Sequence, residues 1–252
     1  MNSIIIPHYC YRLRPMNDLT IDELDNHYLW FSKRSGFNDK CDANIGAFIE
    51  DTPHIKRGLL LRYSEEDIEE LIKQMDNVGI CCFTKKIPSN KNLGLFPNGR
   101  KSICVEYKKN IIEKHFLNRY ALAHPFKNVV YDDQPTKIKS DGNYHILIKK
   151  YKDGCLYQSI YEIFSDIRKV DKLFELLLTR INAKFSKQKE MRIILGGRIL
   201  ENLDTSLAGY KIEIPPDAIS KIYLHNNPSL SYCQKLEKIS SIKGKLEYVN
   251  DN

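Results

Sequence analysis

Hydrophobic and polar positions alternate over residues 9–14, and this period of two predicts a strand that ends at Pro15. Residues 29–32 are a second short apolar run, whereas residues 78–83 and 102–107 are nearly continuous apolar runs typical of buried strands. We expect these last two strands to be neighbours in one sheet. Further strands are predicted at 129–131, 191–195, 210–214 and 219–224.

Other segments show the spacing of helices. The T-I-D-E sequence that starts at Thr20 is a capping box, which predicts a short helix through about Asn26. A second helix is predicted to begin at Ser64, and a third covers residues 110–120. The longest helical pattern runs from residue 156 to residue 185. Its apolar face carries Ile160, Ile163, Ile167, Val170, Phe174, Leu177 and Ile181.

These elements predict one α+β domain, with a mixed or antiparallel sheet and helices packed against it. A length of 252 residues fits a single large domain. Residues 85–101 are rich in Asn, Pro, Gly and Lys, so we expect a mobile loop of the kind that carries function. Residues 136–144 are polar and are interpreted as a hinge.

Composition narrows the class of protein. The 39 Lys and Arg residues exceed the 32 Asp and Glu residues, which gives a formal net charge of +7. This excess permits binding to nucleic acid without requiring it. No apolar run approaches the roughly 20 residues that cross a bilayer, and the first residues lack the features of a signal peptide. We therefore expect a soluble, cytoplasmic protein that does not bind membranes.

Neither the cysteines nor the common catalytic motifs indicate a metal site or a known type of active site. The seven cysteines form no C-x-x-C pair and no spacing that holds zinc, so we expect buried, reduced thiols and no metal. The phosphate-binding loop, the dinucleotide-binding motif, the nucleophile elbow and the zinc-protease motif are all missing from the sequence.

Two segments nevertheless carry candidate chemistry. Arg14 lies at the end of an aromatic and basic strand, where its guanidinium could bind a phosphate or carboxylate bidentately. Gln188, Glu190 and Arg192 would share one face of a strand because side chains alternate with a period of two. An ion pair between Glu190 and Arg192 on an edge strand is the alternative interpretation.

The order of these motifs resembles a large bacterial family of domains. Its members open with Y-x-Y-R-P, continue with L-W-F-S and F-N-D, and later show E-x-E-x-R. The matching residues here are Tyr11, Arg14, Pro15, Leu29, Trp30, Phe31, Ser32, Phe37, Asn38, Asp39, Asp42, Cys82, Phe83, Thr84, Ile103, Cys104, Val105, Glu106, Tyr107, Val129, Tyr131, Pro135, Glu190, Arg192, Pro216, Ile219 and Ile222. The chain departs from the pattern at Leu13, Leu93, Phe96, Pro97, Ser102 and Gln188.

More distantly, the family is similar to the ADP-ribosyltransferase superfamily, whose R-S-E branch has an Arg, a Ser and a Glu in this order. The resemblance implies an ADP-ribosyltransferase-like fold and NAD as the substrate. Arg14 would hold the NAD pyrophosphate, and Ser32 would bind the nicotinamide ribose and orient Glu190. Glu190 would stabilise the oxocarbenium-like transition state, as a carboxylate does in glycoside hydrolysis. Gln188 would contact the acceptor nucleophile.

The resemblance also implies contacts to the rest of NAD. Tyr11, Tyr28 or Trp30 would stack on nicotinamide or adenine, although core packing is the favoured role of Trp30. Asn38 and Asp39 would clamp the dinucleotide, or would form an Asx turn with no ligand.

Two basic segments indicate which kind of molecule would accept the ADP-ribose. Residues 183–198 and residues 85–101 are both rich in Lys and Arg, and the second segment includes Phe96. Basic groups interleaved with an aromatic ring suit single-stranded nucleic acid, whereas the alternative is a solubilising charge run. The expected contacts are Lys189, Arg192, Lys91, Phe96 and Arg100.

The resemblance therefore implies an NAD-dependent ADP-ribosyltransferase that modifies RNA or a protein. The resemblance implies an intracellular toxin or antiphage effector, and a toxin would need an antitoxin partner. Two alternatives remain. One is a metal-independent ribonuclease toxin, for which no acid–base pair is visible. The other is a non-catalytic nucleic-acid-binding module, in which Glu190 and Arg192 form a structural ion pair.

Overall fold

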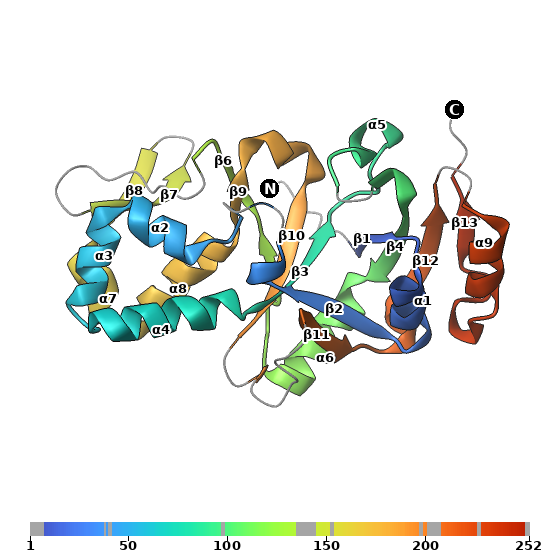
Figure 1. Ribbon diagram of the computed structural model, residues 1–252, viewed down its shortest axis with the longest axis horizontal. Helices are drawn as coiled ribbons and strands as arrows, with labels where there is room; N and C mark the ends of the chain where they lie inside the picture. The colour runs from blue at the N-terminus through green and yellow to red at the C-terminus, as the bar shows by residue number, and fades with distance from the viewer. Residues whose placement is uncertain are drawn as a thin grey trace, which may run out of the picture.

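The computed structural model describes residues 8–37, 39, 42–96, 99–134, 145–151, 154–196, 199–200, 208–225 and 228–249. Within these residues, nine strands form one mixed sheet in the middle of the molecule, with helices packed on it (Figure 1). The expected α+β class with a mixed sheet is confirmed. The strands are β1 (Tyr9–Pro15), β2 (Tyr28–Lys33), β3 (Gly79–Thr84), β4 (Ser102–Lys108), β5 (Phe126–Asn128), β10 (Glu190–Leu195), β11 (Gly209–Glu213), β12 (Ile219–Leu224) and β13 (Leu246–Tyr248).

The sheet forks at β3. One edge of β3 pairs with β10 along its whole length, and β10 pairs in turn with β5. The other edge is shared, because Ile80 pairs with Ser32 of β2 and Thr84 pairs with Tyr11 of β1. The order from one side to the other is β11-β2-β3-β1-β4-β12-β13, with only the last pair parallel.

The prediction that residues 78–83 and 102–107 are neighbouring strands is wrong. Both form strands of the same sheet, but β1 lies between them and pairs with β4 from Tyr9 to Pro15. An apolar run indicates that a strand is buried, and it carries no information about which strand is its partner.

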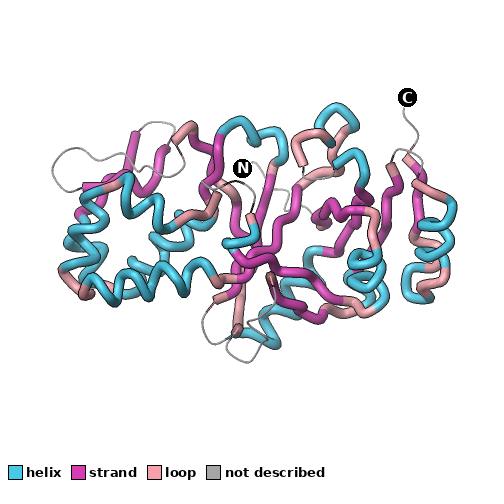
Figure 2. The backbone as a smooth tube through the Cα atoms, in the orientation of Figure 1, coloured by secondary structure: helices cyan, strands magenta, loops and turns pink. Residues whose placement is uncertain are grey.

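The two faces of the sheet pack against different helices. The first face carries Cys81, Phe83 and Val105 and packs on α1 (Asp18–Asp25), α6 (Lys109–Tyr120) and α9 (Leu230–Glu237). The second face carries Ile80 and packs, at its β3 and β10 end, on five other helices. Figures 1 and 2 show these five on one side of the molecule. They are α2 (Ile45–Asp51), α3 (Pro53–Leu60), α4 (Glu65–Asp76), α7 (Ile160–Ser165) and α8 (Ile167–Leu178).

Local capping explains where two of the helices begin. Helix α4 begins after Ser64 as predicted, and Ser64 and Asp67 form a capping box there, with the Ser64 hydroxyl accepting from the Asp67 N–H at 3.1 Å. The capping box predicted at Thr20 is wrong. Helix α1 begins earlier, because the side chain of Asn17 accepts from the Thr20 N–H at 3.0 Å. The Thr20 hydroxyl donates instead to the Pro15 carbonyl at 2.6 Å.

The long helix predicted over residues 156–185 is also wrong. The segment starts as β8 (Gly154–Ser159), which pairs with β7 (His145–Tyr151), and then forms α7 and α8. Asp166 separates the two helices because its side chain accepts from the Arg168 N–H at 3.0 Å. The segment ends as β9 (Arg180–Asn182), which pairs with β6 (Val130–Asp132), and a 3₁₀ helix, η3 (Ala183–Gln188). The predicted hinge at 136–144 lies outside the described residues.

The expectation that cysteines are buried free thiols is confirmed for four of the five described cysteines. Cys10, Cys81, Cys104 and Cys233 are buried free thiols, and Cys82 is half-buried and free. Burial raises the pKa of Cys81 to about 12. None of the helices among the described residues is long and apolar enough to cross a membrane.

Candidate functional site

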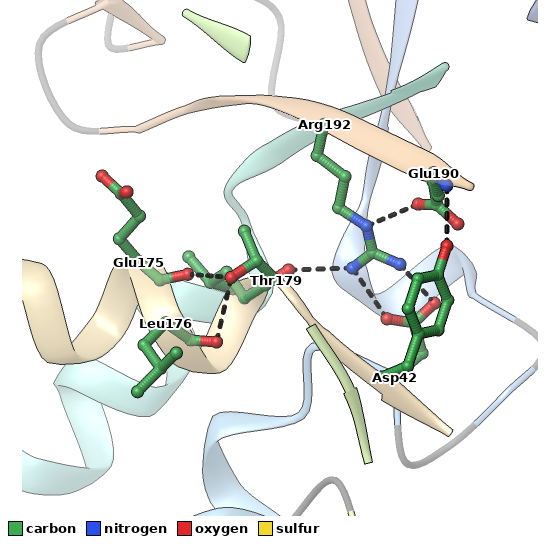
Figure 3. A network of polar contacts seen from close by, with 8 residues as sticks. Asp42, Glu175, Leu176, Thr179, Glu190 and Arg192 are labelled. Atoms are coloured by element: carbon green, nitrogen blue, oxygen red, sulfur yellow. Dashed lines mark hydrogen bonds and ion pairs between the residues drawn. The ribbon is translucent and has the colours of Figure 1, made fainter. Parts of the chain in front are cut away.

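A fully buried arginine organises the second face of the sheet (Figure 3). Arg192 of β10 has a side chain that is 1% exposed. Its Nε donates to Glu190 Oε1 at 2.6 Å, and its two terminal nitrogens donate to Asp42 Oδ1 and Oδ2 at 2.8 and 2.9 Å. One of these nitrogens also donates to the Leu178 carbonyl at 2.8 Å. We call Asp42, Tyr131, Glu190 and Arg192 the Arg192 centre.

The elements around Arg192 hold its partners in place. The hydroxyl of Thr179 donates to the Glu175 and Leu176 carbonyls at 2.9 and 3.1 Å, where helix α8 ends, next to the Leu178 carbonyl that Arg192 uses. The Glu190 N–H donates to the Tyr131 hydroxyl at 2.6 Å, which ties β10 to β6. Strands and a helix from distant parts of the chain therefore meet at one guanidinium.

Charge balance explains why the arginine is stable inside the protein. Burial alone would lower the pKa of Arg192, but the Glu190 and Asp42 carboxylates outweigh it and raise the pKa well above its ordinary value. Burial raises the pKa of Asp42, with Arg192 opposing that shift and the charges of Glu190 and Asp39 adding to it. Two carboxylates against one guanidinium leave this centre with a net negative charge.

The predicted ion pair between Glu190 and Arg192 is present, but it is not on an edge strand. Strand β10 lies between β3 and β5 at Arg192. The Glu190 side chain is 11% exposed, so its carboxylate is fixed by Arg192 while part of it still reaches the surface. This pairing holds the carboxylate in one orientation.

Two basic segments are fastened together beside Glu190. The Thr84 hydroxyl donates to the Gln188 carbonyl at 2.6 Å, and the Lys85 N–H donates to the Lys189 carbonyl at 3.1 Å. The Gln188 side chain, which is buried, donates to the Leu95 carbonyl at 2.5 Å. In Figure 1, α5 (Asn90–Leu93) and the orange turn after β9 lie along the same edge of the molecule.

These segments form a surface that we call the basic rim. Its members are Lys85, Lys86, Lys91, Lys184, Lys187 and Lys189. All except the half-buried Lys85 are exposed, and none has an ion-pair partner within the described part of the chain. Phe96 is half-buried, and the Lys184 ammonium lies 4.8 Å from the ring centre of the half-buried Phe185. The side chain of Arg100 is outside the described residues.

Arg14 lies on the other face of the sheet from Glu190. Strand register places Tyr11, Thr84 and Glu190 in one row on the second face, so Arg12 and Arg14 project from the first face. Both guanidiniums lie 2.5 Å from the Glu23 carboxylate, and Arg12 also donates to the Trp30 carbonyl at 2.5 Å. Burial lowers the pKa of Arg14, and the charge of Arg12 lowers it further.

The other residues assigned to NAD are spread over the sheet. Ser32 pairs with Ile80 on the second face, four residues along β3 from Thr84, or about 13 Å from the row that holds Glu190. Tyr28 is buried, and its hydroxyl donates to Asp22 at 2.7 Å. Trp30 is half-buried, and Asp39 lies close enough to influence Asp42. Asn38 lies outside the described residues.

The structure therefore brings together Tyr11, Gln188, Glu190 and the rim lysines, with Ser32 on the same face. Arg14 and Glu190 lie on opposite faces of the sheet. In this arrangement Arg14, Ser32 and Glu190 do not line one common site for NAD. No group of three or more potential metal ligands occurs among the described residues.

The sequence-based list of site residues omitted Asp42, Tyr131 and Thr84. All three were among the motif residues, and the motif residues Asp42, Thr84, Tyr131 and Glu190 come from separate segments that converge at the Arg192 centre. The convergence of separated motif segments was the available signal. In comparisons with protein-family models, curated proteins and solved structures, no match to this chain was found.

Proposed function

We propose that this protein binds single-stranded nucleic acid along the basic rim, beside the Glu190 carboxylate. The observation that carries the proposal is the fastening of residues 84–96 to residues 183–189 by three hydrogen bonds, across a separation of about a hundred residues. Neither segment contains an acidic residue. The first acid after them is Glu190, which directly follows Lys189 and is held by Arg192. Lysines gathered without counter-charges attract phosphates and release their counterions.

Aromatic rings support a single strand rather than a duplex as the ligand. Phe96 and Phe185 lie in the same two segments as the rim lysines, both are half-buried, and the Phe185 ring lies next to the Lys184 ammonium. Unpaired bases stack on such rings without regard to sequence, whereas the bases of a duplex are already stacked on one another.

A salt titration tests this proposal. Fluorescence anisotropy with a labelled single strand should show affinity that falls as salt rises. Lys189→Glu and Lys91→Glu should each weaken binding and reduce the salt slope by about one unit or less. Lys238→Glu makes the same charge change on an exposed residue near α9, away from the rim, and should leave the slope unchanged. Affinity independent of salt in the wild type would refute the proposal.

ADP-ribosyl transfer from NAD is the second candidate, and the position of Glu190 favours it. Its carboxylate is oriented by Arg192 and lies next to the rim, whose lysines would bind the pyrophosphate in place of Arg14. A fixed carboxylate beside a developing positive charge is the arrangement that cleavage of the nicotinamide–ribose bond needs. The ADP-ribosyltransferase-like fold belongs to this same candidate.

Incubation with labelled NAD, total RNA and cell lysate tests the transferase. Label in RNA or in a protein band should be lost in Glu190→Gln, with the melting temperature reporting whether the variant is folded. Release of nicotinamide without transferred label would indicate hydrolysis of NAD. If neither occurs with the wild type, the transferase candidate is refuted and nucleic-acid binding stands alone. Growth arrest on expression, relieved by a co-expressed antitoxin, would support the predicted toxin role.

A further inference from the structure

The second face of the sheet continues past the basic rim onto β1 and β4. Glu190 pairs with Thr84, and Thr84 pairs with Tyr11, so these three side chains form one row. Adjacent strands are about 4.8 Å apart, which places Tyr11 about 10 Å from Glu190. Tyr9 lies two residues further along the same face, toward the edge where β3 ends and Lys85 follows it. Strand β1 therefore brings two tyrosines close to the rim.

The five helices of the second face do not pack over these tyrosines. The apolar cluster that those helices form includes residues of β3 and β10 and, within the described part of the chain, none of β1, β4 or β12. Tyr9 is 40% exposed and Tyr11 is half-buried. On the first face of the same strands, by contrast, Tyr107 is buried and packs edge-on against Phe83. The rings of Tyr9 and Tyr11 are therefore accessible to a ligand that lies on the sheet.

Lysines lie on both sides of the two tyrosines. Lys86 is exposed on the β3 side, where its carbonyl accepts from the Thr84 hydroxyl at 3.1 Å. Lys108 of β4 pairs in register with Tyr9, so their side chains are neighbours on this face. Lys108 is half-buried and has no ion-pair partner among the residues that the structure describes. A strand whose phosphates contact both lysines would cross the sheet over Tyr9 and Tyr11.

Accessible aromatic rings beside unpaired lysines suit the bases of a single strand. Every base has a flat face that stacks on an aromatic ring, while the phosphates contact the lysines. Tyr9 and Tyr11 are about 6.8 Å apart along β1, so each ring can hold a separate base. The Glu106 carboxylate pairs in register with Tyr11 and repels phosphates there, which leaves the place over Tyr11 to an uncharged base. Other sheets that bind RNA stack two or three bases on aromatic side chains in this way.

We infer that two adjacent bases of the bound strand stack on Tyr9 and Tyr11. This inference rests on the proposed function, because the rim must first bind the phosphates. Stacking releases no counterions, so it adds a part of the affinity that salt does not weaken. It also accepts any base, since every base has such a face.

The test compares oligothymidylate with an abasic strand of the same length, which keeps the phosphates and lacks the bases. In fluorescence anisotropy the wild type should bind oligothymidylate more tightly. Tyr9→Leu and Tyr11→Leu should each weaken that binding about fivefold or more, without changing the salt slope or the binding of the abasic strand. Tyr9→Phe and Tyr11→Phe keep the ring and should retain the affinity. The matched control is Tyr248→Leu, which changes an exposed tyrosine on the first face of the sheet and should have no effect.

The outcomes separate the inference from the proposal beneath it. Equal binding of the two strands by the wild type overturns the inference and leaves the proposed function intact, as does full affinity for oligothymidylate in the folded Leu variants. If Tyr11→Leu does not fold, Tyr9→Leu decides, because Tyr9 is the more exposed of the two. A dimer in sedimentation that Tyr9→Leu dissociates would assign this face to a second copy of the chain and overturn the inference. Failure of the wild type to bind either strand overturns the proposed function, and the inference falls with it.

Discussion

Removing the buried guanidinium should destabilise the fold far more than removing an exposed one. In Arg192→Met, the Glu190 and Asp42 carboxylates, whose side chains are only 11% and 18% exposed, and the Leu178 carbonyl lose four hydrogen bonds. Breaking a buried ion pair by removing one partner costs about 3–5 kcal/mol. That is a large share of the roughly 5–15 kcal/mol by which a protein is stable, and it corresponds to a fall in melting temperature of about 10 °C.

The loss should depend on pH in a defined direction. Burial raises the pKa of Asp42 and Arg192 opposes that shift, so in Arg192→Met the pKa of Asp42 rises further above its unfolded value near 4. A carboxylate whose folded pKa is raised gives its full stability below the unfolded pKa and loses it as pH rises through the folded pKa. The deficit of Arg192→Met relative to the wild type should therefore be largest at pH 7.5 and should shrink as the pH falls toward 4.5.

Urea unfolding followed by circular dichroism at pH 7.5 and 4.5 measures both effects. The matched control is Arg119→Met, because Arg119 donates to Glu213 at 3.0 Å but is 49% exposed. That exposed pair should contribute no more than about 1 kcal/mol. If Arg192→Met lost less than about 1 kcal/mol at pH 7.5, the conclusion that the centre depends on its arginine would be refuted.

Three further predictions concern the rim and the first face. Gln188→Ala removes the side-chain bond to the Leu95 carbonyl, so nucleic-acid affinity in anisotropy should fall although no charge changes; unchanged affinity would count against a joined rim. Lys189 has a positive φ of 51°, so Lys189→Gly should raise the unfolding free energy by about 1 kcal/mol in urea while weakening binding. Glu23→Gln leaves Arg12 and Arg14 buried without their carboxylate and should cost about 3 kcal/mol in the same unfolding assay.

The elements predicted correctly are those that local physics determines. Strand β1 follows from alternation and from Pro15, and α4 follows from the capping box at Ser64. The helix predicted over 156–185 failed because its apolar spacing continues through Asp166, where one side-chain hydrogen bond ends the pattern. Its first part is a strand only because β7 is there to pair with it, and pairing between strands is not a local property.

The candidate site also has a part that local sequence patterns predict and a part that they do not. That Glu190 and Arg192 share a face follows from the period of a strand, and the sequence predicted it. The partner that completes the centre, Asp42, is 150 residues away, and no local pattern connects the two. The face on which Arg14 lies relative to Glu190 depends on the registers of β1, β3 and β10 together. A change of one residue in either register would reverse it, so order along the chain could not decide it.

In the proposed complex with nucleic acid, the charges of the two buried clusters would set the orientation of the bound strand. On the first face, Arg12 and Arg14 share Glu23, which leaves a positive excess away from the rim. On the second face, Asp42 and Glu190 exceed Arg192 by one negative charge, directly beside the rim. Phosphates are therefore attracted to the lysines and repelled from Glu190. The sugars and bases of the same strand carry no such charge, so they are the parts that would turn toward Glu190. This orientation is the one that a carboxylate acting on a ribose requires.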